Sequence, residues 1–244
     1  LQLVERSIAN NNFTLDRDKG FWIHTNFNIS KAVLRSTLSI SSGEGRIISG
    51  KNGRLCYSGR MEYLPLGDFS KNGAYVEADI ERELKPKISI AGAYSYNDGA
   101  IRTMGQLGDF LYNSQTANIQ YYGADVLFKY KGFSLASELY NRNSSNGPIT
   151  NDSDTTQINF IVSGTAFVIQ SGYFVTGTNE ISMRYAQIEP EAKVASVMST
   201  QKEYVVGFSH YFNKHSLKVQ SDITYYENGA INSLVYRLSG VVTF

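Results

Sequence analysis

Residues 87–97 read KISIAGAYSYN, and their side chains alternate between two kinds. One row contains Ile88, Ile90, Gly92, Tyr94 and Tyr96, and the other contains Lys87, Ser89, Ala91, Ala93 and Ser95. Successive side chains of an extended strand point to opposite faces of a sheet. The pattern therefore predicts a β-strand with one apolar face and one polar face, and residues 216–226, SLKVQSDITYY, repeat it.

The same alternation recurs along the chain in segments of about ten residues separated by turn residues, which is typical of a transmembrane β-barrel. The predicted strands are residues 20–28, 31–42, 54–65, 87–97, 118–130, 132–143, 165–176, 180–188, 201–212, 216–226 and 232–244. A soluble β-sandwich alternates in the same way, so the pattern alone leaves both classes open. Aromatic clusters near segment ends, such as YSY, QYYG and HYF, favour the barrel because aromatic side chains gather at the two membrane interfaces.

Composition excludes several other classes. The chain has 17 Tyr, 13 Phe and 21 Gly with a mean hydropathy of -0.26. Its net charge of +1 offers no strong field for nucleic acid. One cysteine and three dispersed histidines predict neither a disulfide framework nor a metal site. No nucleophile elbow or HExxH motif occurs, so we expect no enzyme, no catalytic residue and no cofactor.

The links between predicted strands alternate between short and long. Outer-membrane barrels have short periplasmic turns and long extracellular loops. Residues 43–53, 98–117, 144–164 and 189–200 are the expected extracellular loops. Residues 66–86 are predicted to form a long, charged periplasmic connection. If residues 73–83 formed another strand, the barrel would have about twelve strands.

The strand count has a consequence for what precedes Leu1. Roughly eleven strands are visible, whereas bacterial barrels have an even number. The first strand also runs inward from the outside. We therefore expect residues 1–244 to be a single all-β domain, a transmembrane antiparallel outer-membrane β-barrel that lacks its N-terminal strands.

Several segments resemble a known family. VERSIANNNFTLDRDKGFWIH, GRMEYLPLGDF, SGYFVTGTNE, MRYAQIEP, FSHYFNKHSLKVQSDITYY and YRLSGVVTF resemble, in order, stretches of phosphate-selective porins of the O and P type in their Bacteroidota-like branch. The resemblance implies a barrel of about 16 strands, often a trimer, that passes small anions through the outer membrane of a Gram-negative bacterium. About five strands would then lie upstream of Leu1.

The last segment is similar to the signal that the outer-membrane insertion machinery reads. Its outward row contains Tyr236, Leu238, Val242 and Phe244. These four residues are the expected insertion signal, and outer-membrane lipid is the expected partner of that row.

The polar rows would line the lumen, where width and charge select solutes. The inward basic residues are Arg35, Arg54, Arg60, Lys87, Lys129, Arg142, Arg184, Lys218 and Arg237, and the inward acids are Glu62, Asp125, Glu138, Glu180 and Asp222. Nine cations against five anions favour anions weakly. The expected anion contacts are Arg35, Arg54, Arg60, Lys87, Arg184, Lys218 and Arg237. Alternatively, cations pair with acids on neighbouring strands: Arg60 or Arg54 with Glu62, Lys218 with Asp222, and Lys129 with Asp125.

Two functions remain open from the sequence. The first is a passive porin for small hydrophilic solutes with a weak anion preference. The second is a barrel subunit, without transport, of a larger outer-membrane assembly. The expected partners are small solutes, the insertion machinery, and either further copies of the chain in a homotrimer or a larger complex. Nucleic acid is not an expected partner.

Overall fold

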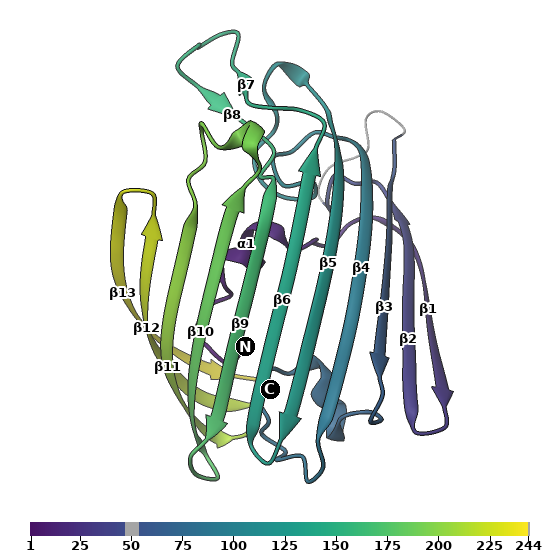
Figure 1. Cartoon of the computed structure of the whole chain (residues 1–244), viewed down its shortest axis with the longest axis vertical. Coiled ribbons are helices and arrows are strands. Elements are labelled where there is room, and N and C mark those ends of the chain that lie inside the picture. The colour runs from purple at the N-terminus through teal and green to yellow at the C-terminus, as the bar shows by residue number, and fades with distance from the viewer. Residues whose placement is uncertain (47–53, 244) are drawn as a thin grey trace.

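One antiparallel sheet contains nearly all regular structure of the computed structural model, which describes residues 1–46 and 54–243 (Figure 1). Its eleven strands are β1 (Gly20–Ile29), β2 (Ala32–Ser41), β3 (Cys56–Leu64), β4 (Lys87–Ala100), β5 (Ala117–Tyr130), β6 (Phe133–Ser144), β9 (Gly164–Phe174), β10 (Asn179–Pro190), β11 (Gln201–Asn213), β12 (Leu217–Asn228) and β13 (Ile231–Val242). They follow one another in chain order as a meander. Within the described residues β1 and β13 each have one neighbour, so the sheet is open.

Every predicted strand is present, with ends shifted by a few residues. The alternative strand at residues 73–83 is wrong, because the link between β3 and β4 contains only a 3-10 turn at Ser70–Tyr75. The periodicity did not predict the helix α1 (Ile8–Phe13), nor the small hairpin of β7 (Ile149–Thr150) and β8 (Ile158–Asn159). Two short 3-10 turns complete the structure, Tyr112–Ser114 and Ala192–Val194. Phe244 and residues 47–53 of the first predicted loop lie outside the described residues.

Long and short links lie at opposite ends of the sheet (Figure 1). The links that follow β2, β4, β6 and β10 lie at one end, the long-loop end. The short turns after β1, β5, β9 and β11 lie at the other, the short-turn end, together with residues 65–86. This geometric alternation follows from the antiparallel order and matches the predicted one. The compartments assigned to the two ends stay predictions.

The two faces of the sheet differ in chemistry. The outer face has exposed apolar side chains, such as Val206 at 59% and Ile223 at 51%. The opposite, inner face contains polar side chains such as Gln220 and Thr224, and residues 1–19 pack against it. Antiparallel pairing in register places alternate side chains of every strand on the same face. The sheet is curved, with α1 on its inner side (Figure 1).

Residues 1–19, here called the inner segment, run along the inner face from the short-turn end to the long-loop end. Lys218 at the start of β12 donates to the carbonyl of Leu1 (2.6 Å). The Glu203 carboxylate accepts from the Ile8 amide (2.8 Å), and Ser7 caps α1 by accepting from the Asn10 amide (3.0 Å). The segment is therefore fixed by polar contacts along its whole length.

Apolar packing holds the middle of the inner segment. Ala9 and Phe13 are fully buried and pack with Tyr140, Val168 and Ile188. The Phe13 and Tyr140 rings stack with centroids 6.4 Å apart. Burying an aromatic side chain of this size stabilises the packing by about 1.5–3 kcal/mol. The segment is thus part of the core between it and strands β6, β9 and β10.

Residues 65–86 fold back over the short-turn end of the inner face. Lys129 donates to the carbonyls of Gly73 (2.7 Å) and Ala78 (2.9 Å). Asp79 accepts from the amide of Gly132 (2.7 Å). These contacts of Lys129 and Asp79 with backbone groups hold the stretch in place, and its charged side chains do not line an alternating strand.

Candidate functional site: a polar hollow on the inner face

The inner segment leaves part of the inner face uncovered, along β1 to β5. Three cavities lie there, of about 290, 370 and 660 Å³. All three include Thr37 in their lining, so they adjoin one another, and we call them together the hollow. Its far wall is the inner segment itself, through Thr14 and Leu15. A depression of this size accommodates a small solute.

Small residues open the hollow. Arg60 on β3 pairs in register with Ala93 on β4, which pairs with Gly123 on β5. Ala93 and Gly123 are neighbours in register and have no large side chain, so they leave space above the sheet. The Tyr121 ring bends over Gly123, where an added Cβ would lie 2.8 Å from the Tyr121 hydroxyl.

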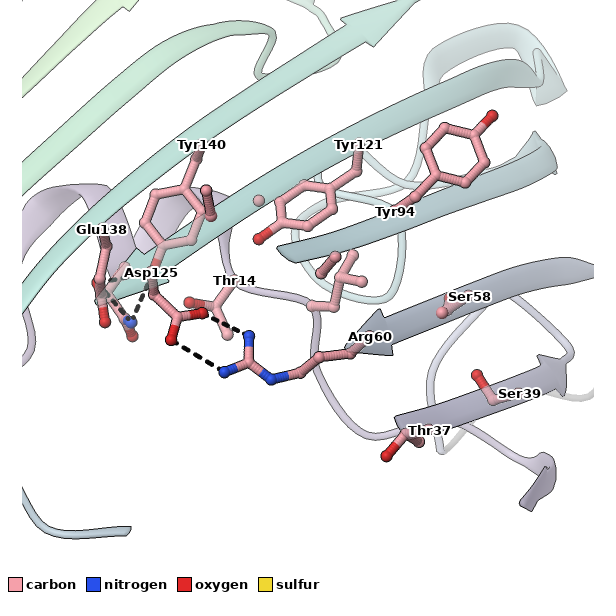
Figure 2. Close-up of a pocket in the computed structure, with 16 residues that line it drawn as sticks. Thr14, Thr37, Ser39, Ser58, Arg60, Tyr94, Tyr121, Asp125, Glu138 and Tyr140 are labelled. Atoms are coloured by element: carbon pink, nitrogen blue, oxygen red, sulfur yellow. Dashed lines mark hydrogen bonds and ion pairs between the residues drawn. The ribbon is translucent and has the colours of Figure 1, made fainter. Parts of the chain in front are cut away.

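An ion pair crosses the middle of the hollow (Figure 2). The Arg60 guanidinium extends past β4 and binds both oxygens of Asp125 on β5, one of them at 2.9 Å. Both side chains keep solvent contact, with 42% and 30% exposed. A two-point fork of this kind fixes geometry, although a partly exposed pair contributes only about 0–1 kcal/mol to stability.

Glu138 on β6 lies directly opposite Asp125 in the sheet register. It accepts from the Tyr140 hydroxyl (2.6 Å) and, at 3.5 Å, from the Asn10 amide. It has no ion pair with a basic side chain in residues 1–46 and 54–243. Glu138 is therefore a carboxylate of the hollow whose charge no cation of the described residues balances by contact.

The Tyr121 hydroxyl also faces the hollow. The side chain is 6% exposed, and its hydroxyl has no hydrogen bond to the described residues. Figure 2 shows the ring directing this hydroxyl toward the space beside Thr14 and Asp125. The hydroxyl oxygen is not among the fully buried atoms of the structure, so it is open to the hollow and can contact water or a ligand there.

The predicted anion contacts are mostly engaged elsewhere. Arg184 binds Glu203 (2.6 Å) and the carbonyl of Glu5 (2.9 Å). Lys218 binds the carbonyl of Leu1, and Lys87 that of Leu66 (3.0 Å). These cations therefore fix the inner segment and the link after β3.

Arg54 and Arg237 also have partners in the protein. Arg54, at the long-loop end, lies 3.6 Å from Asp98. Arg237 binds Asp222 (3.2 Å) and Thr224 (2.7 Å). Of the seven predicted contacts, only Arg35 and Arg60 line the hollow.

Arg142 is the most deeply placed of the inward cations. It is 1% exposed and donates to the carbonyls of Asn12 (2.8 Å), Phe13 (3.0 Å) and Val162 (3.2 Å). All three acceptors are backbone groups, and two belong to the inner segment. Arg142 therefore anchors the end of α1 to the sheet.

The predicted cross-strand pairs need correction. Arg60 binds Asp125 instead of Glu62, Arg54 lies by Asp98, and Lys129 binds backbone carbonyls. Asp222 binds Arg237 instead of Lys218. Glu62 pairs with Arg35 at 3.0 Å. Glu62 and Asp222 thus pair with their direct register neighbours, Arg35 and Arg237. Arg60 can reach Asp125 because the intervening strand β4 has alanines on its inner face.

Acidic side chains outnumber basic ones in the hollow, whereas the sequence predicted nine cations against five anions on the whole inner face. Its lining contains two arginines, Arg35 and Arg60, and five carboxylates, Asp16, Asp18, Glu62, Asp125 and Glu138. Sequence reasoning missed the contributions of Tyr121 and Asn10. The row of Ala91, Ala93 and Gly123 on the inner face was the available signal, because small side chains mark where space remains.

Other features limit the chemistry of this region. No group of His, Cys, Asp and Glu able to hold a metal occurs in the described part of the chain. Cys56 is buried and lies 3.2 Å from the Ser95 hydroxyl. None of the described helices is both long and apolar enough to cross a membrane.

Three comparisons with known proteins gave no match: no family model, no curated protein and no solved structure is similar to this chain. The resemblance to phosphate-selective porins therefore stays a prediction.

Proposed function

We propose that this sheet is part of an outer-membrane β-barrel that forms a passive channel for small hydrophilic solutes. The observation that carries the proposal is the pairing of an exposed apolar outer face with a polar, hollowed inner face on the same strands. In water such an outer face would be a large exposed apolar patch, which soluble monomers rarely have. In a bilayer it contacts hydrocarbon.

The outer face also has aromatic side chains near both ends. Tyr185, Tyr204 and Tyr225 are neighbours in register toward the long-loop end, with ring centroids 5.1 and 6.2 Å apart. Phe133 and Tyr173 pair near the short-turn end. Aromatic girdles at both membrane interfaces are a feature of outer-membrane barrels.

The outward row of β5 has an aromatic side chain on each side of a short apolar stretch. Tyr122 and Phe128 on β5 are six residues apart, which corresponds to about 20 Å of strand. The outward side chains between them are Ala124 and Val126. The apolar band of a barrel is about 25 Å tall.

The open edges of the sheet fit the same proposal. Phe21 on β1 is 88% exposed and Leu234 on β13 is 72% exposed. Unpaired strand edges do not persist in a membrane, so in the proposed barrel further strands pair with both. A barrel of about 16 strands, as the resemblance implies, would close the sheet in this way.

The proposal also has consequences for how the protein enters the membrane and assembles. Tyr236, Leu238 and Val242 are 59–68% exposed on the outer face of β13. There they are accessible to the insertion machinery that would read them together with Phe244. A trimer, or attachment to a larger complex, would use the outer face of the closed barrel.

The experiment is a planar-bilayer recording of the purified full-length protein under a KCl gradient. Stable conductance supports the channel, and its reversal potential tests the predicted weak anion preference. The five carboxylates that line the hollow outnumber its two arginines and favour cations instead. A silent bilayer from protein with intact β structure by circular dichroism would contradict the channel and favour the second candidate, a non-transporting barrel subunit.

A further inference from the structure

The carboxylates Asp125 and Glu138 lie directly opposite each other on β5 and β6, on the inner face. Like charges at directly opposed positions destabilise a sheet. One arginine, Arg60, lies beside them, and its fork is occupied by Asp125. The pair therefore has one unit of negative charge that the described side chains do not compensate by contact.

The cations that could have balanced this charge are used for another purpose. Lys129, Arg142 and Lys218 bind backbone carbonyls of the link after β3 or of the inner segment. These three side chains hold the two segments against the sheet, and their positive charges lie at those backbone contacts. The hollow is left with two arginines against five carboxylates.

A second and independent observation points to a ligand at the same place. The Tyr121 hydroxyl is part of a side chain that is only 6% exposed, and it has no hydrogen-bond partner in the described residues. It points into the cavity of about 370 Å³ that Asp125, Glu138 and Asn10 also line (Figure 2). A phenol oxygen accepts a hydrogen bond from an N–H donor.

We infer that this part of the hollow binds the ammonium group of a small organic cation, with Glu138 as its counter-charge and Tyr121 and Asp125 as further acceptors. The inference rests on the proposed channel only for its role in transport, because the three residues named for the site all lie on one cavity of the described residues. A free anion fits poorly, since it would meet both carboxylates and an arginine that already has a partner. A cation with three N–H donors matches three acceptors.

The binding test uses 1,4-diaminobutane as the probe, titrated calorimetrically into the full-length protein in detergent. Glu138→Gln keeps the shape of the side chain and its acceptor oxygen but removes the charge, so we expect about tenfold weaker binding. Tyr121→Phe removes one hydrogen bond and should weaken binding about three- to tenfold. The matched control is Glu189→Gln, at an exposed position near the end of β10.

The transport test uses the same variants in planar bilayers. Diaminobutane should reduce the wild-type current, and Glu138→Gln should relieve this block and shift the reversal potential toward chloride. Tyr121→Phe should relieve the block while leaving the reversal potential unchanged. Circular dichroism and gel mobility of unheated protein confirm that each variant is folded.

The outcomes separate the two proposals. A conducting channel to which diaminobutane does not bind, or binds equally well in Glu138→Gln, overturns the ammonium site and leaves the channel standing. A silent bilayer with Glu138-dependent binding overturns the channel and leaves the site standing. Block by an uncharged sugar of similar size, insensitive to Glu138→Gln, would also overturn the assignment of a cation.

Discussion

Arg60 reaches across strand β4 to bind Asp125 on β5, two strands away from its own. The alanines on the inner face of β4 make this possible, because no bulky side chain lies in the path. The pair divides the hollow, so its removal changes the free cross-section.

For Arg60→Gln we expect a higher single-channel conductance and a loss of stability of about 1 kcal/mol or less, since the pair is partly exposed. Planar-bilayer recording measures the first and urea unfolding the second. Selectivity should move toward cations, because Asp125 loses its partner. Arg54→Gln, which removes a pair at the long-loop end, is the control. Unchanged conductance would mean that this pair does not narrow the path.

Arg142→Gln tests the attachment of the inner segment. The arginine is buried and holds the carbonyls of Asn12 and Phe13. A shorter neutral side chain leaves them without a donor, at a cost of about 1–3 kcal/mol. Amide exchange should therefore rise at residues 8–14 before it rises in β4 or β5. Uniform exchange across the sheet would show that Arg142 stabilises the whole fold and not this contact.

Gly123→Ala tests the shape of the hollow. The added Cβ would lie 2.8 Å from the Tyr121 hydroxyl and 3.2 Å from its ring. The ring must move, so we expect altered conductance and weaker binding of the ammonium probe. Gly240→Ala, where a Cβ meets nothing within 4 Å, is the control and should behave as wild type. Equal effects of both substitutions would contradict a specific contact.

Val206→Arg tests the membrane assignment of the outer face. Val206 is 59% exposed in the middle of β11. On a soluble protein an arginine at such a position changes the free energy of unfolding little. At the bilayer midplane of a barrel it lowers this free energy by about 2–4 kcal/mol. Urea unfolding in liposomes measures this difference, with Val206→Ile as the control. A cost below about 0.5 kcal/mol would contradict contact with hydrocarbon.

His215 predicts a pH dependence at the short-turn end. The residue lies in the turn between β11 and β12, and its Nε2 atom is buried without a hydrogen-bond partner among the described residues. Burial lowers the pKa of His215 from 6.5 to about 4, and the nearby Lys218 and Lys129 add to the effect. The folded state therefore disfavours the protonated ring.

The sign follows from proton binding. Between about pH 6.5 and pH 4 the unfolded state binds the proton and the folded state does not, so stability should fall as the pH is lowered through this window. His215→Gln should flatten that part of the urea-stability profile. An identical slope in the variant would assign the dependence to other groups.

Local sequence pattern determined the sheet. Strands such as residues 87–97 and 216–226 alternate apolar and polar side chains, and a period of two has meaning only for an extended chain. The predicted count of about eleven strands and the separation of long from short links were therefore confirmed. The inward position of Arg60, Asp125 and Glu138 followed from the same alternation.

Tertiary structure alone decided what the inner face contacts. The inner segment has no period of its own, and its partners are far away in sequence: Gln2 binds Glu180, and Arg142 binds Phe13. Alternation assigns a side chain to a face but not to a partner, because distance across a curved sheet depends on all strands between. The tertiary structure thus decided that most inward cations hold backbone carbonyls, while Asp125 and Glu138 remain in an open hollow because small residues on β4 and β5 leave the space unfilled.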